Sequence, residues 1–572
     1  MSLYIQLGQE MSVNISKKKR DVLISRVKSI KDFISSCPQD QNTQNLLGYI
    51  GDILKEINRK KYGLIFEEHR EKIDELLSTH IPILAEEPDL TINNGGEQNF
   101  LIEGDNLAAL QLLEKTHKGK IDVIYIDPPY NTLKNEKDDF TYDDVKIDKS
   151  DTFFHSKWLS FMEKRIKIAY ELLSNRGCIF ISIDDHEFAN LKILMDSIFR
   201  EQNYLCDIIW NSTKSVTNTA VVSVSHTYNL VYFKDINYII EHRTEFRIPD
   251  PGEGFSNPDN DPRGLWKADP FQVGGWRPNQ QYEIVNPNTG IIYKPNKGNS
   301  WKNDFKKFQE LLADNRIVFG KNGTSGPQRK RFIWEAEERG RVVKTIWDDV
   351  DTTTNGTQEL KSIFGGDSPF SNPKPTNFIQ RILQLSTSPS STILDFFAGS
   401  GTTGHAVLKL NAEDGGHRRF ILCTNNENNI CRDITYQRLK TVITGKRKDG
   451  SVYSDGMPGS LKYFKVDFIP VDDQMYYEYA DQLLENIRTL VELENAADMD
   501  NNKSVSIIMD DDELDDFFSS IEQHSECKSL YLSHDILISK DQEHKLHKKG
   551  IEIKTVPEYF YPDTESRGSD EY

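Results

Sequence analysis

Short apolar segments that alternate with amphipathic ones are the feature that most restricts what this 572-residue chain can fold into. Between residues 91 and 235, apolar runs at residues 100–102, 121–126 and 177–183 have the length and composition of buried strands, and helical periodicity fills the stretches between them. Strands separated by helices of this length form βαβ units with a buried, mostly parallel sheet. The same alternation returns at residues 361–465. The sequence therefore predicts an α/β fold whose sheet is built from two halves of the chain.

Five regions follow from where this alternation stops and resumes. Residues 1–90 interleave charged and apolar residues at helical spacing, which predicts a helical N-terminal region. Residues 91–235 and 361–465 hold the two α/β halves. Residues 236–360 are dense in Gly, Pro, Asn and Trp and have poor periodicity, which indicates turns and short β segments in an inserted domain. Residues 466–572 mix helical and strand patterns and are expected to form a small C-terminal α/β domain.

The charge is distributed unevenly along the chain. The formal net charge is −19, and residues 471–572 alone hold 26 acidic and 9 basic residues, a balance of −17, so the remaining body is near neutral at −2. Nucleic-acid binding depends on local basic patches rather than on net charge, so the acidity excludes no nucleic-acid partner. The C-terminal segment is too acidic to hold phosphates, and we interpret it as a surface for protein interaction or dimerisation.

Several classes of protein are disfavoured by what the sequence lacks. No run of 18 apolar residues exists and no apolar N-terminal segment precedes a cleavage site, so we expect a cytoplasmic protein with no membrane partner. No histidine and cysteine cluster has metal-ligand spacing, so no metal site is expected. No CxxC spacing occurs, which argues against a zinc ribbon or a disulfide framework, among the six cysteines Cys37, Cys178, Cys206, Cys423, Cys431 and Cys527.

A glycine-rich turn follows the strand predicted at residues 392–396. Glycine permits a tight turn between a strand and a helix and lets a ligand approach the backbone closely. The lysine of a GxxxxGKS or GxxxxGKT loop is absent, so the turn is not a nucleoside-triphosphate loop. Asp395 ends the strand and can accept a hydrogen bond from a ligand amine, which indicates a cofactor loop, with a tight packing turn as the alternative. The loop consists of Phe397, Ala398, Gly399, Ser400, Gly401, Thr402 and Thr403.

A second motif, Asp127-Pro128-Pro129-Tyr130, ends another apolar strand. The two prolines fix the backbone φ angle, so the carboxylate of Asp127 and the carbonyl of Pro128 form two neighbouring acceptors. Two acceptors can hold both N–H groups of an exocyclic amine and direct its nitrogen toward a methyl donor. Tyr130 offers a ring on which a base can stack, provided that the base is extruded from the duplex. The alternative is a proline-terminated strand with a capping aspartate.

Two further loops accompany these motifs. Gly104-Asp105-Asn106 ends the strand before the Asp127 strand, and Asn372-Pro373-Lys374-Pro375 opens the helix before the glycine-rich loop. Lys374 could pair with a ligand carboxylate, and Asp105 could accept from an adenine amine. A surface lysine and a helix N-cap are the alternatives for these two residues.

Together these motifs resemble the modification subunits of type III restriction-modification systems, which are adenine-N6 DNA methyltransferases of the beta arrangement. In that arrangement the Asp-Pro-Pro-Tyr loop precedes the target-recognition region and the FxGxG loop follows it, which is the order of residues 127–130, 236–360 and 397–403 here. The resemblance covers residues 90–465 well. Further similar segments lie at residues 158–162, 182–185, 226–228, 345–348 and 394–403.

The resemblance implies a Rossmann-like, S-adenosylmethionine-dependent methyltransferase fold with roles for the matching residues. Asp127, Pro128 and Tyr130 would hold and stack the flipped adenine, and Pro129 would shape the loop. Asp395 and residues 397–403 would bind S-adenosylmethionine.

The resemblance also implies that Lys374 and Asp105 bind the two ends of the cofactor. Methyltransferases often carry an acidic residue after the second strand to bind the ribose hydroxyls, and this sequence departs from that pattern. Asn425 lies nearest to the expected place, and Glu427 comes two residues later.

The resemblance also implies partners: double-stranded DNA, a second copy in a homodimer, and a helicase-nuclease restriction subunit. Sequence choice is expected to depend on the insert, whose candidate DNA contacts include aromatic and basic side chains. Two other functions stay open, a cytosine-N4 or RNA amino-methyltransferase and a catalytically inactive DNA-binding specificity subunit. Aspartate at position 127, where cytosine-type loops more often have serine, disfavours cytosine. The candidate contacts are Trp266, Trp276, Arg277, Trp301, Lys321, Arg329, Lys330 and Arg331.

Overall fold

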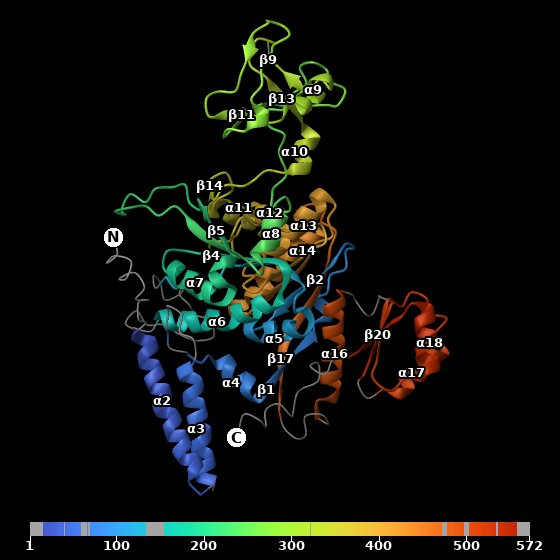
Figure 1. Ribbon diagram of the computed structural model, residues 1–572. Helices are drawn as coiled ribbons and strands as arrows, with labels where there is room; N and C mark the ends of the chain where they lie inside the picture. The colour runs from blue at the N-terminus through green and yellow to red at the C-terminus, as the bar shows by residue number, and fades with distance from the viewer. Residues whose placement is uncertain are drawn as a thin grey trace, which may run out of the picture.

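A ten-stranded central sheet organises the chain in the computed structural model (Figure 1), confirming the predicted α/β class. The structure describes residues 15–38, 41–58, 66, 69–132, 154–320, 322–471, 478–496, 503–533 and 536–556. Neighbours from β17 to β4 pair in parallel, whereas β1 and β6 pair antiparallel with the strands beside them. In spatial order the strands are β1 (His80–Glu86), β17 (Ser460–Pro470), β2 (Gln98–Glu103), β16 (Arg419–Thr424), β15 (Thr392–Asp395), β3 (Ile121–Ile126), β4 (Leu173–Ile183), β6 (Thr227–Phe233), β5 (Tyr204–Trp210) and β14 (Ile346–Trp347).

Helices cover both faces of the sheet because successive strand residues point to opposite sides. In β3, Ile124 and Ile126 belong to one buried core, and Val123 and Tyr125 belong to the other. The first core lies under α5 (Asn106–His117), α6 (Phe154–Leu172), α7 (Phe188–Met195) and α16 (Ala480–Asn495). The second lies under α8 (Ile236–Glu241), α11 (Thr353–Phe364), α12 (Thr376–Ser386), α13 (Thr402–Asp414) and α14 (Tyr436–Thr444).

Among the described residues of the N-terminal region, the α-helices end at residue 79. Helices α2 (Ile15–Ser36) and α3 (Gln41–Asn58) lie side by side and extend away from the body, and α4 (Lys72–Thr79) follows. Residues 80–86 instead form β1, which pairs with β17 at the edge of the sheet. The helical expectation for residues 1–90 is wrong over this segment, because a short apolar run does not distinguish a strand from the end of a helix.

The insert forms a lobe with its own core, which projects above the sheet in Figure 1. The chain enters and leaves the lobe where Ile248 and Arg341 pair. Helix α8 and most of α11 lie inside the predicted range 236–360, but they pack on the main sheet, so the lobe is shorter than that range. It contains β7 (Trp266–Pro270), β8 (Gln272–Gly274), β9 (Ile284–Val285), β10 (Ile292–Tyr293), β11 (Asn299–Trp301), α9 (Phe305–Ala313), β12 (Ile317–Val318), β13 (Gln328–Phe332) and α10 (Ile333–Arg339).

The C-terminal region divides into two parts. Residues 466–470 complete β17, and α16 packs on the main core through Ile487, Leu490 and Val491, so these residues belong to the central domain. A small three-stranded parallel sheet with its own core then follows. Among the described residues, no helix is both long and apolar enough to cross a lipid bilayer. The small unit contains β18 (Val505–Ile508), α17 (Asp511–Ser519), β19 (Ser529–Leu532), α18 (Lys540–Lys549) and β20 (Glu552–Thr555).

Candidate active site

Most of the predicted site residues lie at one edge of the sheet, where four neighbouring parallel strands end. Asp395 is the last residue of β15, and Asp127 directly follows β3, which is paired with β15. Asn425 directly follows β16, and Asp105 lies two residues beyond β2. Because carboxyl ends of adjacent parallel strands form a crevice where ligands bind, this arrangement defines the candidate active site.

Asp127 is at the centre of a three-residue polar contact. Its Oδ1 accepts a hydrogen bond of 2.8 Å from the hydroxyl of Tyr130, and its Oδ2 accepts one of 2.5 Å from Nζ of Lys374. Nζ of Lys374 also lies 3.0 Å from the Tyr130 hydroxyl. Burial and the charge of Asp127 raise the pKa of Tyr130 well above its usual value, so this hydroxyl stays a donor. The Asp127 side chain is 30% exposed, which leaves room for a third partner.

The backbone of the Asp-Pro-Pro-Tyr loop is held in place by residues that the sequence analysis did not identify. The buried indole of Trp158 donates a 2.7 Å hydrogen bond to the carbonyl of Pro129. Asn131 has a left-handed backbone, with φ of 57°, and its amide contacts the carboxylate of Glu187 at 2.5 Å. Glu187 is fully buried and also contacts Nδ1 of His155 at 2.7 Å. These contacts fix the path of the loop that carries Asp127 and Tyr130.

Asp395 is a buried carboxylate within the second loop. Its Oδ1 accepts from the backbone N–H of Phe397 at 3.0 Å, and its Oδ2 accepts from the hydroxyl of Thr403 at 2.5 Å. Burial raises the pKa of Asp395 to about 7, an effect that these two hydrogen bonds partly offset. The nearby charge of Asp127 raises this pKa further, and that of Lys374 lowers it. The carboxyl therefore titrates near neutral pH.

The glycines of this loop are required by its path. Gly399 and Gly401 have φ of 49° and 76°, which side chains disfavour. A Cβ at Gly399 would lie 3.2 Å from the Phe370 ring, and one at Gly401 would lie 3.2 Å from the Thr435 methyl. The turn is therefore packed closely, and neither position accommodates a side chain without displacing its neighbour.

Arg438 links the glycine-rich loop to the loop that carries Lys374, a role that no sequence signal indicated. Its guanidinium is fully buried and donates to the hydroxyls of Thr402 at 2.7 Å and Thr376 at 3.0 Å. The hydroxyl of Thr402 also donates to the backbone carbonyl of Lys374 at 3.2 Å. Glu359 of α11 lies 3.3 Å from the same guanidinium and balances its charge.

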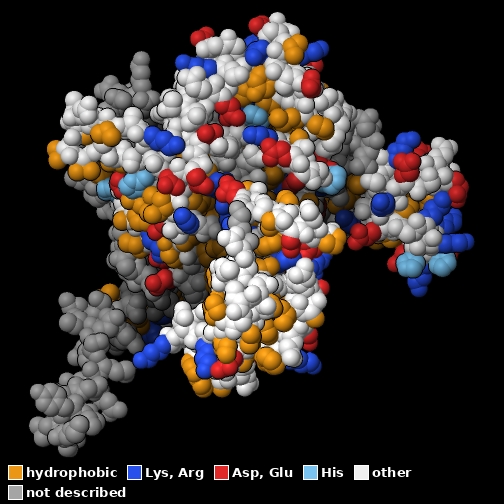
Figure 2. All heavy atoms as spheres, turned by 90° about the horizontal axis from the view of Figure 1, so that it is seen from above, with side chains coloured by type: hydrophobic (Ala, Val, Ile, Leu, Met, Phe, Trp, Pro, Cys, Tyr) orange, Lys and Arg blue, Asp and Glu red, His pale blue; other side chains and the backbone are white. Residues whose placement is uncertain are grey.

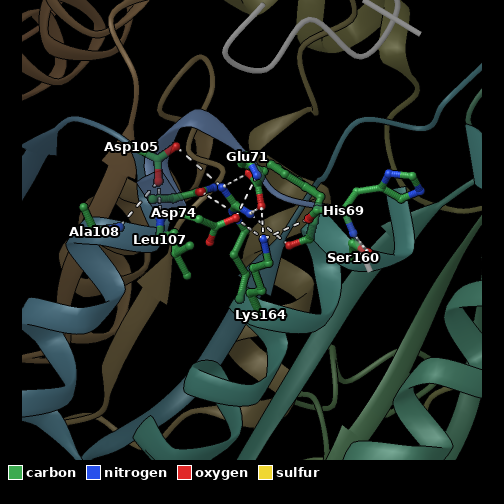
Figure 3. Close-up of polar contacts among 11 residues, drawn as sticks. His69, Glu71, Asp74, Asp105, Leu107, Ala108, Ser160 and Lys164 are labelled. Carbon is green, nitrogen blue, oxygen red and sulfur yellow. Dashed lines mark hydrogen bonds and ion pairs between the residues drawn. The ribbon is translucent and has the colours of Figure 1, made fainter. Parts of the chain in front are cut away.

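Asp105 caps a helix and contacts a buried arginine. Its Oδ1 accepts from the backbone N–H of Leu107 at 2.7 Å, so it is the N-cap of α5 (Figure 3). Its Oδ2 lies 3.5 Å from the guanidinium of Arg165, which is fully buried. Burial raises the pKa of Asp105, and the charge of Arg165 partly offsets this effect. The capping alternative is therefore realised, and contact with a cofactor stays a prediction.

Arg165 joins the N-terminal segment to the cofactor loop. Its two terminal nitrogens donate to the two carboxylate oxygens of Glu71 at 3.0 and 2.9 Å. Its Nε donates to the side-chain oxygen of Asn106 at 2.5 Å, and the Asn106 amide donates to the carbonyl of Phe396 at 2.9 Å. This chain of contacts reaches from residue 71 to the residue before the glycine-rich loop.

The basic and aromatic residues proposed for DNA contact differ in their exposure and in their ion pairs. Lys330 is fully buried between Asp259 and Asp261, so it is not a surface phosphate contact. Trp301 is in the core of the lobe, whereas Trp276 is 68% exposed. Lys321 lies outside the described residues. Arg329 and Arg331 form ion pairs with Glu335 at 2.9 Å and Asp269 at 3.1 Å, and Arg277 donates its backbone N–H to Ser300.

A basic hollow lies where the lobe joins the body. The cavity has a volume of about 330 Å³ and includes two carboxylates, Asp250 and Glu253. Its position beside the Ile248–Arg341 pairing places it at the connection between lobe and sheet. Five basic side chains line it, those of Arg247, Lys267, Arg331, Arg339 and Arg341.

The sheet topology and the two loops define a Rossmann-like methyltransferase fold. The Asp-Pro-Pro-Tyr loop and the glycine-rich loop follow the adjacent strands β3 and β15. Residues 121–437 match the DNA methylase family, and this protein belongs to that family. The type III restriction-modification enzyme StyLTI Mod subunit of Salmonella typhimurium is 35% identical over 62% of this chain and 58% of its own length. Type II methyltransferase M.KpnI of Klebsiella pneumoniae is 35% identical over 64% of this chain and 90% of its own length.

A third relative, the type III restriction-modification enzyme EcoP15I Mod subunit of Escherichia coli, is 29% identical over 57% of this chain and 58% of its own length. The chain therefore spans a little more than half the length of the type III subunits that it matches.

Proposed function

We propose that this protein is a site-specific DNA methyltransferase that moves a methyl group from S-adenosylmethionine to N6 of an adenine flipped out of duplex DNA. We further propose that it acts in the cytoplasm as the modification subunit of a restriction-modification system. The observation that carries the proposal is the position of the Asp127 carboxylate, hydrogen-bonded by Tyr130 at the end of β3, next to the glycine-rich loop after β15. Membership of the DNA methylase family supports the same reaction class.

Two features of the glycine-rich loop support the binding of S-adenosylmethionine there. Gly399 and Gly401 keep side chains away from the turn, and the buried Asp395 offers a carboxylate to a positively charged amino group. S-adenosylmethionine, when bound, supplies a methyl group on a sulfonium that is a good leaving group. The protein would bind it with Asp395 and residues 397–403, and Asn425, directly after β16, would contact the ribose hydroxyls.

The residues after β3 would position the adenine amine. The Asp127 carboxylate and the Pro128 carbonyl would accept hydrogen bonds from the two N–H groups of the amine. These bonds would direct the nitrogen lone pair toward the methyl group and increase the electron density on the nitrogen. Tyr130 would stack on the extruded base. The amine proton becomes acidic only as the new bond forms, so Asp127 need not be a strong base. Lys374, which contacts both side chains, would hold them in this geometry.

Sequencing of modified bases in DNA from cells that express the protein tests this function directly. N6-methyladenine at one short sequence is expected. N4-methylcytosine would support the cytosine alternative, and S-adenosylmethionine binding without any methylated base would support an inactive specificity subunit.

Cofactor affinity should depend on pH through Asp395. Its pKa of about 7 lies above the ordinary value of 3.8, so the ionised form that attracts an ammonium group dominates only above about pH 7. We expect affinity for S-adenosylmethionine to fall between pH 8 and pH 6, approaching about tenfold per pH unit below the midpoint. Calorimetric titration at several pH values measures this. Asp395→Asn should bind weakly at pH 8 and lose the dependence, whereas Asp414→Asn should keep it.

The same carboxyl should oppose folding when it is ionised. Because its pKa is raised in the folded protein, its contribution to stability is complete below pH 3.8 and is lost as the pH rises through about 7. Asp395→Asn is therefore expected to melt at a higher temperature than the unchanged protein at pH 8. A lower melting temperature for this variant would contradict the burial argument.

We propose that the lobe between residues 248 and 341 recognises the DNA sequence that is methylated. It projects from a sheet that an insertion at this point leaves intact, and loops placed on a rigid scaffold are where recognition usually lies. Replacing it with the lobe of a related enzyme should change the methylated sequence but leave N6 of adenine as the methylated atom. Sequencing of modified bases measures both. An active chimera that still methylates the original sequence would place recognition outside the lobe.

We also propose a homodimer and a helicase-nuclease restriction subunit as partners, with the acidic C-terminal unit as a contact surface. A chain that ends near residue 465 would cut β17 and is unsuitable as a test, because that strand pairs with β1 and β2. A chain that ends near residue 500 keeps α16 and removes only the small unit. Light scattering should report a lower oligomeric mass for it, and an unchanged mass with unchanged partner binding would reject this surface.

A further inference from the structure

The connection between β5 and β6 is an extended loop with an apolar tip. We call residues 213–225 the valine loop. Val221 and Val222 have relative exposures of 103% and 79%, and Val216 and Val224 have 73% and 62%. Lys214 is the loop's one charged residue, and the others are small residues, mainly Ser and Thr. In Figure 1 the loop extends beyond the end of β5, and Figure 2 shows a largely uncharged projection on that side of the molecule.

The base of the valine loop is fastened firmly to the sheet. The backbone N–H of Asn211 donates to the carbonyl of Trp347 at 3.0 Å, and that of Thr353 donates to the carbonyl of Ser212 at 3.1 Å. Across the loop, the N–H of Thr213 donates to the carbonyl of Ser225 at 3.2 Å. The exposed tip is therefore part of an ordered loop whose base is hydrogen-bonded to β14 and α11.

The base of the valine loop lies at the edge of the sheet where β4 ends. Tyr228, three residues after the loop, is the second residue of β6 and pairs with Ile183, the last residue of β4. The ring of Tyr228 contacts that of Phe188, and its hydroxyl interacts with Asp185. The loop therefore leaves the sheet at the edge where β3 and β4 end, which is the edge that carries the Asp-Pro-Pro-Tyr motif.

Packing within this chain does not explain the apolar tip. Val221, at 103% exposure, buries none of its surface in the protein, and the loop's other three valines also keep more than half of theirs exposed to water, at a cost. The polar neighbours make local contacts, such as the 2.9 Å bond from the N–H of Thr217 to the hydroxyl of Ser223. The valines are thus available to a surface outside the chain.

We propose that the valine loop is a wedge that enters the DNA base stack where the target adenine leaves it. This inference rests on the proposed function, because it takes an extruded base as its premise. Extrusion breaks stacking and pairing and leaves a gap beside the orphan base. Apolar side chains inserted between base steps are a recurring way to kink or unstack a duplex. A tip with one basic residue and no acidic one meets no repulsion from the flanking phosphates.

The wedge should matter only where extrusion is difficult. With a matched duplex, the protein must break a base pair, and the valines replace part of the lost stacking. With the target adenine opposite an abasic site, little pairing has to be broken, so the contribution of the wedge should largely disappear. This difference between two substrates separates a wedge from a general DNA contact, which would affect both alike.

The test compares Val221→Ser/Val222→Ser with the unchanged protein in single-turnover methylation. On the matched duplex we expect a rate about 10- to 100-fold lower, and on the abasic-site duplex a rate within about threefold of the unchanged protein. DNA affinity and melting temperature should stay close to those of the unchanged protein. Val221→Leu/Val222→Leu, which keeps the apolar tip, should retain most of the activity on both substrates. Val452→Ser, at a valine that is 74% exposed in the cofactor half, is the matched control.

Three outcomes would overturn the wedge. Equal rates on the matched duplex would show that the tip does not assist extrusion, and equal losses on both substrates would make it a general DNA contact. Normal methylation with a lower oligomeric mass would make it a protein contact. Failure of the unchanged protein to methylate adenine in either duplex would instead reject the proposed function.

Discussion

Asp127→Ala should lower the rate of adenine methylation by at least about 100-fold, the scale of losing one preorganised polar group. The change removes the carboxylate that accepts from Tyr130 and Lys374 and that would hold the adenine amine. The glycine-rich loop keeps its own contacts, so S-adenosylmethionine should bind within about tenfold of the unchanged protein. Single-turnover methylation and calorimetric titration measure the two quantities separately.

Two further variants sharpen this test. Asp127→Asn keeps the size of the side chain but turns one acceptor into a donor, so it should be nearly as inactive as Asp127→Ala. Asp349→Ala removes another carboxylate, 57% exposed and paired with Arg381 in a 2.6 Å contact, and should leave the rate nearly unchanged. Near-normal turnover in Asp127→Ala would remove the role assigned to this residue.

The central sheet was predictable because its strands are short apolar runs with helices between them. Residues 121–126 became β3 as expected, and the strand expected at residues 392–396 became β15, which ends one residue earlier, since a strand buried on both faces leaves little ambiguity in sequence. Strand β1 was missed because it follows a helix directly and lies at the edge of the sheet. The lobe and the C-terminal unit are shorter than expected, because a change in composition marks a loop and does not show which flanking helices pack on the sheet.

The candidate site was predictable where motifs follow strands, and less so where chain segments meet in space. Asp127 and Asp395 lie at the ends of adjacent strands, as their positions in sequence indicated. Lys374 contacts Asp127, a pairing 247 residues apart that no local pattern shows. Buried charges such as Arg438 were missed for the same reason, because an arginine on an amphipathic helix looks like a solvent-exposed residue until its partners are known.

The second large effect is expected from Arg165→Met, in the network that joins the N-terminal segment to the cofactor loop. Lys164 lies beside Arg165 and forms ion pairs with Glu71, at 3.3 Å, and with Asp74, while the N–H of His69 donates to the Ser160 hydroxyl at 3.0 Å (Figure 3). Residues 69–74 are therefore held to α6 by several polar contacts, of which the fully buried Arg165 is the centre.

Arg165→Met should reduce the free energy of unfolding by about 3–5 kcal/mol, because it leaves the carboxylate of Glu71, only 10% exposed, without its bidentate partner. Denaturant unfolding measures this loss. Glu71 keeps its ion pair with Lys164 at 3.3 Å, and removing its charge as well, in Arg165→Met/Glu71→Gln, should recover part of the loss. Lys192→Met, which breaks a more exposed ion pair with Asp196, should cost less than about 1 kcal/mol.

Arg165→Met should also weaken S-adenosylmethionine binding. Measuring this affinity separates the effect of Arg165 on the cofactor site from its effect on stability. Arg165 orients Asn106, whose amide donates to the carbonyl of Phe396 directly before the glycine-rich loop, and it offsets part of the burial cost of Asp105. The double variant should recover part of the stability without restoring the contact to Asn106, so its cofactor affinity should stay low. If affinity returns together with stability, Arg165 acts only through folding. If neither changes in Arg165→Met, the buried network does not couple the N-terminal segment to the cofactor site.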